Sequence, residues 1–194
     1  MKITFPRILP TALALGLTQL AFAATETHTI DAVHSSVGFS IRHFVAKVPG
    51  KFSQFNGQLT LDRANLANSS VEASIATTSI NTDNRKRDDH LRGADFFDVA
   101  KYPAITFKSR KWTRTGENTF DVAGDLTLKG VTREVVLKTT FLGFGPGMGG
   151  AQLSGWEGTI TIDKKQFNMA DPAMLDAALG DEVAITINVE AKKV

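Results

Sequence analysis

The sequence contains no cysteine among its 194 residues. Disulfide bonds, a thiol nucleophile and a cysteine-ligated zinc site are therefore excluded, and so is the lipidated cysteine of a bacterial lipoprotein. A chain of this length can bury a sizeable core without covalent cross-links. We expect a single domain that is stabilised by packing and hydrogen bonds.

The sequence also lacks a clear excess of charge of either sign. It has 22 basic and 20 acidic residues, and Lys2 and Arg7 alone account for the difference. Proteins that bind nucleic acids normally carry a basic excess. We therefore expect no nucleic-acid partner.

Long apolar runs are missing as well, apart from residues 8–20. This run is shorter than the roughly 20 residues that a membrane span requires, and Pro10 interrupts it. Lys2 and Arg7 precede the run, and the small-x-small sequence Ala21-Phe22-Ala23 follows it. This order of a charged start, a short apolar run and small residues is typical of a secretory signal peptide.

The pattern predicts that residues 1–23 form a signal peptide that is cleaved after Ala23. Residues 24–194 would then form one exported domain. We expect this domain to work in the periplasm.

Apolar and polar residues alternate along most of the remaining chain, which is the pattern of antiparallel strands with one buried face. Residues 119–128 and 183–190 show it most clearly. Eight or nine such strands indicate a sandwich or a closed barrel, and the pattern does not separate the two. We predict strands over residues 27–31, 35–47, 51–62, 69–79, 103–113, 118–128, 132–144, 155–164 and 182–192.

Two segments have the start and stop signals of short helices. Asp171-Pro172 would begin a helix that continues through residues 173–179 and ends at Gly180. A second helix of one or two turns is predicted within residues 83–93. Turns are predicted at Pro49-Gly50 and along the glycine-rich residues 143–150.

Catalytic side chains are scarce, because the sequence holds four histidines and no familiar catalytic motif. There is no His-x-x-x-His pair and no Gly-x-Ser-x-Gly elbow. His34 and His43 are nine residues apart, so on one strand they would face opposite sides and share no metal. We predict that His28, His34, His43 and His90 are hydrogen-bonded side chains at turns and strand ends, and that the protein is not an enzyme.

Residues 85–98, "RKRDDHLRGADFFD", combine a charged run with two adjacent phenylalanines. On a short helix Arg85 would pair with Asp89, and Asp88 with Arg92, at i,i+4 spacing. This favours a solvated helix face, although Asp88, Asp89 and His90 could also assemble into a site with distant residues. Phe96-Phe97 would anchor the loop against the barrel or border a binding site.

Several stretches of the sequence resemble the YceI-like family of exported polyisoprenoid-binding proteins. They occur in order and span nearly all of the predicted exported domain. Residues 80–109 are the most specific, with Arg-Asp-x-His-Leu, then Asp-Phe-Phe-Asp, Tyr-Pro and Phe-x-Ser. The matching stretches are residues 30–44, 50–62, 80–109, 124–137 and 180–191.

The chain departs from the family at two positions, where Lys164 and Asn168 stand for the more usual arginine and glycine. Asparagine tolerates the left-handed backbone that glycine supplies, so we expect the turn to persist. Lysine lacks the planar fork of donors of arginine. A role of that arginine in holding a neighbour or a head group is therefore in doubt here.

The resemblance implies an all-β fold, an eight-stranded antiparallel lipocalin-like barrel with a long apolar cavity and one or two short helices. It implies a carrier of one long-chain isoprenoid, either a polyprenyl phosphate or a ubiquinone-like quinone. No cofactor would be required beyond the bound lipid. Transient membrane contact is expected, and monomer and homodimer both stay open. The alternatives are an enzyme that acts on a bound lipid, a binder of other amphiphiles such as fatty acids, and a solid structural or adhesive β-domain.

The inward-facing positions of the predicted strands supply the candidate cavity lining, although each could instead belong to a solid core. Small residues on the same faces, Gly124, Gly158 and Ala73, would leave room for a ligand. Arg87, His90 and Arg92 are candidates for contacts with a polar head group at the cavity mouth. The candidate lining residues are Val37, Phe39, Ile41, Phe107, Phe120, Val122, Leu126, Val135, Leu137, Phe141, Ile160, Ile162, Ile185 and Ile187.

Overall fold

The computed structural model describes Met1 and residues 25–169 and 178–194. The predicted signal peptide lies outside these residues, except for Met1, and so does most of the predicted helix that begins at Asp171. The two residues at its predicted end are described, and there β11 already begins at Leu179. Within the described ranges, no helix combines the length and the hydropathy that crossing a membrane requires.

Most of the described chain is β-strand, as the alternating pattern predicts. Within residues 25–169 and 178–194, one α-helix and four short 3-10 helices interrupt the strands. They are α1 (Arg85–Arg92), η1 (Leu66–Asn68), η2 (Thr77–Ser79), η3 (Met148–Gly150) and η4 (Lys164–Phe167). The strands are β1 (Thr25–Ile30), β2 (Ser36–His43), β3 (Ala46–Phe52), β4 (Phe55–Asp62), β5 (Ser70–Ala76), β6 (Ile80–Asn81), β7 (Ala104–Arg114), β8 (Thr119–Leu128), β9 (Val131–Pro146), β10 (Gln152–Asp163) and β11 (Leu179–Lys193).

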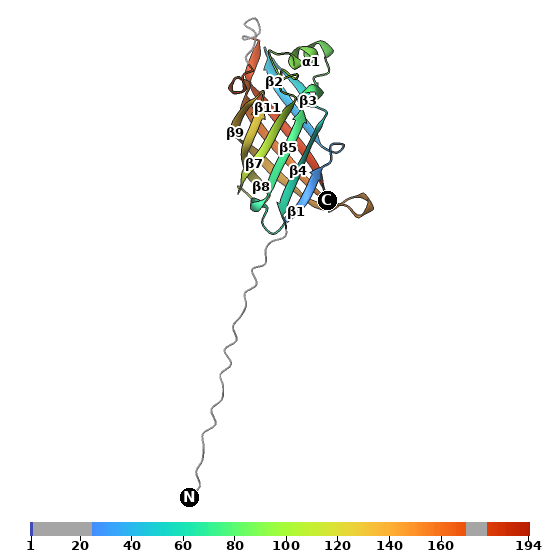
Figure 1. Cartoon of the computed structure of the whole chain (residues 1–194), viewed down its shortest axis with the longest axis vertical. Coiled ribbons are helices and arrows are strands. Elements are labelled where there is room, and N and C mark those ends of the chain that lie inside the picture. The colour runs from blue at the N-terminus through green and yellow to red at the C-terminus, as the bar shows by residue number, and fades with distance from the viewer. Residues whose placement is uncertain (2–24, 170–177) are drawn as a thin grey trace.

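The strands close into an eight-stranded antiparallel barrel (Figure 1). The ring runs β1-β4-β5-β7-β8-β9-β10-β11 and closes because β11 also pairs with β1. Strands β1 and β2 both pair with β11, at different places along its length. Strand β4 pairs with β1 and β3 pairs with β2, so β3 and β4 share the next position around the barrel. Strand β5 pairs with β4 and β6 pairs with β3, so β5 and β6 share the position after that. Three of the eight positions around the barrel are thus each filled by two short strands. This confirms the barrel and excludes the sandwich.

Two predicted strands, residues 35–47 and 51–62, are wrong as single elements. The chain reverses at Phe44-Val45, where Phe44 takes a left-handed φ of 49°, and Pro49-Gly50 is not a turn but lies inside β3. Strand β6 pairs only with the last two residues of β3. Pro49 therefore sits at an edge position, where a missing N–H is tolerated.

Gly50 is required by packing and not by a turn. A Cβ at this position would lie 2.3 Å from Cζ of Phe39 on the neighbouring strand. The glycine leaves room for that ring to lie over the backbone of β3. Sequence patterning cannot distinguish this use of glycine from a turn.

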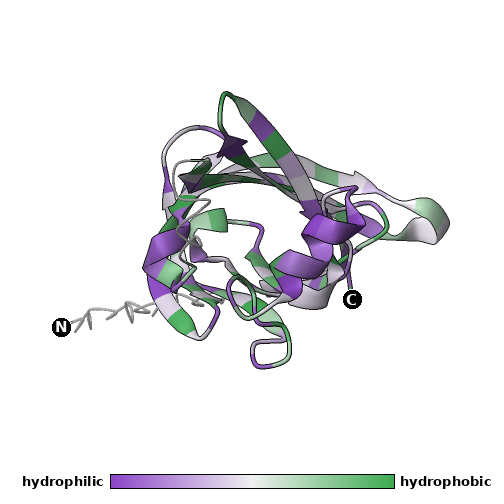
Figure 2. Cartoon of the chain, turned by 90° about the horizontal axis from the view of Figure 1, so that it is seen from above, coloured by the Kyte–Doolittle hydropathy of each residue, from purple (hydrophilic) through white to green (hydrophobic). Residues whose placement is uncertain are grey.

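Helix α1 lies within the predicted residues 83–93 and ends at Gly93 as predicted. The Asn84 side chain accepts a hydrogen bond from the Arg87 N–H at its start, and Gly93 follows its last residue. The helix lies over part of the rim at one end of the barrel (Figures 1 and 2). We call this end the mouth, and it also carries the β2–β3 hairpin and η4. The opposite end carries the start of β1, the C-terminus and the loop that contains η3 (Figure 1).

The barrel interior holds two apolar clusters. The mouth-side cluster includes Val37, Phe52, Ile80, Ile105, Leu128, Ile162, Phe167 and Met169. The floor-side cluster, toward the opposite end, includes Leu59, Leu61, Leu66, Trp112, Phe120, Val122, Trp156 and Ala191.

Candidate functional site

A cavity of about 450 Å³ runs through the barrel interior. This volume lies in the usual range of small-molecule sites, roughly 300–1,000 Å³. The inward faces of β2, β7, β8, β10 and β11 line it with isoleucine, leucine, valine and aromatic side chains. Because the interior is hollow, the alternative of a solid structural β-domain is wrong.

Eleven of the fourteen predicted lining residues border this cavity, as expected from their alternation along the strands. They come from β2, β7, β8, β9, β10 and β11. The eleven are Val37, Phe39, Ile41, Phe107, Val122, Leu126, Leu137, Ile160, Ile162, Ile185 and Ile187.

Phe120, Val135 and Phe141 do not line the cavity, and this part of the prediction needs correction. Phe120 packs beside Trp112 with ring centroids 5.9 Å apart, and Phe141 lies 4.6 Å from Trp156. Both fill the barrel end below the cavity. Val135 packs against the mouth-side cluster. Phe120 is thus a buried core residue, and Val135 and Phe141 are partly buried residues packed against the core.

Further lining residues come from strands that the prediction left out of the cavity. Val71 and Ile75 lie two residues on either side of the predicted Ala73 along β5, so the same period-two signal could have found them. Leu91, Phe96 and Phe97 line the mouth from α1 and the loop after it, and no strand pattern could predict them. The other added residues include Ile30, Val48, Phe52, Phe55, Leu59, Ile105, Met169, Val183 and Val189.

The floor of the cavity is formed by two tryptophans. Trp112 and Trp156 pack edge to face, with ring centroids 5.4 Å apart and an interplanar angle of 88°. Both line the cavity and are almost fully buried. Within the described part of the chain, neither indole N–H has a hydrogen-bond partner. These are the only tryptophans in the sequence, so both intrinsic fluorophores lie at this floor.

Small residues keep the cavity wall open at two of the three predicted positions. Gly158 and Ala73 line the cavity. A Cβ added to Gly158 would meet only ordinary contacts, 3.5 Å from Leu137 and 3.8 Å from Ile187. Gly124 does not line it, because the Phe107 ring already occupies the space beside it.

The basic lining residues His43, Arg87, His90 and Lys164 gather at the mouth. Arg87 donates from Nε to Thr82 Oγ1 at 2.7 Å and from Nη2 to the Thr82 carbonyl at 2.8 Å. His90 packs edge to face on Phe96 at 5.1 Å. Two of the three predicted head-group residues, Arg87 and His90, therefore border the opening.

Arg92 does not border the opening, contrary to the prediction. Its guanidinium donates to the carbonyl oxygens of Thr78 and Ile80, at 3.0 and 2.8 Å, and to Asp89. The helix places it on the side that faces η2 and β6. Arg92 therefore fastens α1 to the barrel.

The predicted pair of Asp88 with Arg92 is also wrong, whereas that of Arg85 with Asp89 is present at 4.0 Å. Asp88 is buried and accepts hydrogen bonds from the N–H and the hydroxyl of Thr82. The charged run is therefore only partly a solvated face. The Asp88 carboxylate holds Thr82 in place just before α1 begins.

Lys164, at the position of the family's usual arginine, is buried at the mouth. Its ammonium donates to the Gly180 carbonyl at 2.8 Å and to Asp181 at 3.2 Å. Hydrogen bonds from Lys165 and Lys164 hold the pKa of the Asp181 carboxyl below its usual value. Asn168 has the left-handed conformation, with φ 58° and ψ 29°. The turn persists as predicted, and Lys164 fastens η4 to the start of β11.

The remaining histidines lie away from one another. His28 is fully buried and bonded to Ser154 and the Ala191 carbonyl. His34 lies in the turn between β1 and β2 and is hydrogen-bonded to Asp31 at 2.9 Å, which raises the pKa of His34. Among the described residues, Asp31, His34 and Glu190 form the one group that brings potential metal ligands together. This group is outside the cavity, and exposed groups of this kind are common without a metal.

The chain resembles known proteins in both sequence and fold. Residues 28–191 match the family described as the YceI-like domain. A UPF0312 protein of Vibrio cholerae serotype O1 (strain M66-2) is 37% identical over 166 residues, which cover 82% of this chain and 88% of the relative.

Solved structures share the fold. That of Burkholderia cenocepacia BcnA is 26% identical with a TM-score of 0.76, covering 83% of this chain and 98% of that one. A polyisoprenoid binding domain from Saccharophagus degradans has a TM-score of 0.67 over 88% of this chain and 100% of that one. At 14% identity, this second likeness concerns the fold alone.

Proposed function

The chain belongs to the YceI-like family, and we propose that its barrel holds the tail of one long-chain isoprenoid, a polyprenyl phosphate or a ubiquinone-like quinone. The observation that carries this proposal is the apolar cavity of about 450 Å³, whose basic lining residues gather at the mouth. An amphiphile with a long apolar tail and a polar head matches this distribution.

The apolar tail is the part of such a lipid that needs protection from water. Each buried methylene contributes about 0.8 kcal/mol relative to an exposed one. The costs of ordering a flexible chain reduce the net affinity well below the sum of these contributions. The cavity therefore only needs to be dry, apolar and open at one end.

The polar head would remain at the mouth, beside Arg87 and His90. Arginine offers five N–H donors in a planar fork, and two of those of Arg87 already hold Thr82. This anchoring fixes the guanidinium before a ligand arrives. A phosphate would gain more from it than a neutral quinone, because charge-assisted hydrogen bonds are the stronger ones.

Together with the predicted signal peptide, these properties support our proposal of a periplasmic carrier, for which we propose no catalytic activity. Such a carrier would move or store a lipid that cannot cross the aqueous periplasm alone. An enzyme that acts on the bound lipid is the competing proposal. Ligand recovered intact after prolonged incubation supports the carrier, and a product that accumulates with time supports the enzyme.

The test uses the two tryptophans at the cavity floor as reporters. A quinone with a long isoprenoid tail should quench their fluorescence saturably, with one ligand per chain by native mass spectrometry. A quinone that lacks the tail should require a far higher concentration, because burial of the tail provides the affinity. Equal affinity for both quinones would contradict the proposal, and a matching fatty acid would show whether other amphiphiles compete.

A further inference from the structure

The tip of the β2–β3 hairpin exposes two apolar side chains at the cavity mouth. Phe44 is 59% exposed and Val45 is 101% exposed. Turns normally use glycine, asparagine or aspartate where the backbone is left-handed, yet Phe44 occupies that conformation with φ 49°. An aromatic residue is therefore held in an unfavourable backbone region and presented to solvent.

The exposed tip is fixed by hydrogen bonds. The Phe44 N–H donates to the Ala178 carbonyl at 2.7 Å, and Arg42 Nη1 donates to the Phe44 carbonyl at 3.0 Å. The His43 ring packs edge to face on the Phe44 ring at 4.8 Å. The presentation of Phe44 is thus built into the fold.

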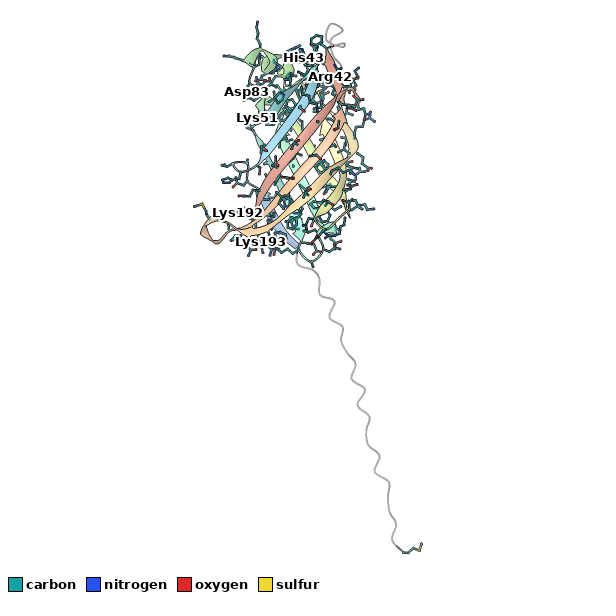
Figure 3. All side chains as sticks on the ribbon, turned by 180° about the vertical axis from the view of Figure 1, so that it is seen from behind. Arg42, His43, Lys51, Asp83, Lys192 and Lys193 are labelled. Atoms are coloured by element: carbon teal, nitrogen blue, oxygen red, sulfur yellow. The ribbon has the colours of Figure 1, made fainter. Side chains whose placement is uncertain are left out.

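The tip lies directly beside the cavity opening. Ile41, His43 and Val48, on either side of it, line the cavity, whereas Phe44 and Val45 do not. Figure 3 shows Arg42 and His43 at the mouth end of the barrel. A surface that contacts this tip would therefore also face the opening.

The hairpin carries basic residues without acidic partners. No aspartate or glutamate occurs between Asp31 and Asp62. Arg42 and Lys47 are cross-strand neighbours in the hairpin, and Lys51 follows on β3. In the described ranges, none of these three is within ion-pair distance of a carboxylate.

Basic residues on the barrel wall behave differently. Lys108 pairs with Glu72 and Lys138 with Asp121, each at 2.7 Å. These two wall cations are thus neutralised locally, whereas none of the three hairpin cations is. Exposed apolar side chains beside uncompensated cations are typical of proteins that bind the interface of an anionic membrane.

The opposite end of the barrel provides a natural comparison. Leu142 is 60% exposed and Met148 is 97% exposed, close to the values of Phe44 and Val45. No charged residue occurs between Leu142 and Leu153. This end therefore has similar exposed apolar residues in an uncharged loop. The cations beside it are Lys193, which pairs with Glu26 at 2.9 Å, and Lys192, the cross-strand neighbour of Leu153, against three such cations on the hairpin (Figure 3).

We propose that the β2–β3 hairpin docks the barrel mouth-first on an anionic lipid bilayer. Phe44 and Val45 enter the boundary of the apolar layer, and Arg42, Lys47 and Lys51 meet the lipid phosphates. The cavity opening then faces the bilayer, so that a tail can enter or leave without passing through water. This last step rests on the proposed lipid-carrying function, whereas docking itself does not.

Vesicle flotation tests the proposal with purified full-length protein. Vesicles of phosphatidylethanolamine with phosphatidylglycerol should carry the protein, and phosphatidylcholine vesicles should carry much less. Replacing both tip residues, F44S/V45S, should weaken binding to the anionic vesicles by about tenfold or more, from the loss of two buried apolar side chains. The variant K47Q/K51Q should weaken binding and reduce its dependence on salt.

The matched control is L142S/M148S, which removes similar apolar residues at the opposite end and should leave binding unchanged. Equal loss in this control, or wild-type protein that fails to float with anionic vesicles, would overturn the proposal. Tryptophan quenching by the long-tailed quinone, without vesicles, should be the same in F44S/V45S as in the wild type. If quenching fails while flotation persists, the cavity proposal fails and docking stands.

Discussion

Gly158 shows how one residue keeps the barrel open. It is buried on the inner face of β10, and a Cβ there would meet its neighbours at ordinary contact distances of 3.5 Å or more. A larger side chain can therefore be attached, and its outer atoms would extend into the cavity. At Gly124, by contrast, a Cβ would lie 2.5 Å from the Lys108 carbonyl and would force the backbone to shift.

We expect Gly158→Leu to abolish or strongly weaken binding of a long-tailed quinone while the protein stays folded. Leucine would occupy the space that the tail needs. Fluorescence quenching would measure binding, and circular dichroism melting would measure stability. Unchanged affinity in a folded variant would show that the tail does not lie beside β10.

The two arginines of α1 should differ in their effect on ligands. Arg87→Ala should weaken a polyprenyl phosphate by about tenfold more than a quinone, because a charge-assisted hydrogen bond is lost for the phosphate only. Arg92→Ala should affect both ligands equally, since Arg92 holds α1 to Thr78 and Ile80. Binding titrations of both ligands with each variant would measure the ratio of the two affinities. If the preference for phosphate over quinone changed only in Arg92→Ala, the assignment of Arg87 to the head group would be contradicted.

At the scale of elements, the connection from η4 to β11 depends on a charged cluster. Asp181 receives hydrogen bonds from Lys165 and Lys164, which lower its pKa in the folded protein. A carboxyl whose pKa is lowered on folding stabilises the protein above its unfolded pKa. That contribution is lost as the pH falls through the lower, folded pKa.

Asp181→Asn should therefore lower the melting temperature at neutral pH and change it progressively less as the pH is lowered through the acidic range. Melting curves of the wild type and the variant across this range would measure the difference. Because Asp181 is about half exposed, solvent and salt screen the effect. If the difference in melting temperature between the two proteins stayed constant with pH, the variant would act through packing and not through the charge of Asp181.

The element scale also shows where sequence patterning failed. Residues 37–42 alternate, and the alternation breaks at Phe44-Val45-Ala46, but none of these three is a turn-forming residue type. The reversal therefore has no turn signal in residue type. Pro49-Gly50 has a strong turn signal, but the edge position of Pro49 and the Phe39 ring beside Gly50 overrule it. Helix α1 was predicted correctly because its start and stop signals are local.

At the scale of the whole molecule, the hollow barrel should be stabilised by its ligand. The folded barrel provides the cavity and the unfolded chain does not, so binding shifts the folding equilibrium. Ligand at 100 times its dissociation constant should add about 2.7 kcal/mol to the free energy of unfolding. Removing co-purified lipid should lower the melting temperature, and adding long-tailed quinone back should restore it. Gly158→Leu should show no such response.

The sequence by itself determined most of the strands, helix α1 and the inward face of most strands, because alternation and capping depend on residues that are close in the chain. It also located most of the cavity wall, since residues on one face of a strand share one environment. Closure into a ring, the split of three barrel positions into two strands each, and the tryptophan floor were decided only by the tertiary structure. The roles of Arg87 and Arg92 were decided there as well. Each of these depends on pairs such as β1 with β11, or Arg92 with Thr78, which are distant in sequence and meet only when the barrel closes.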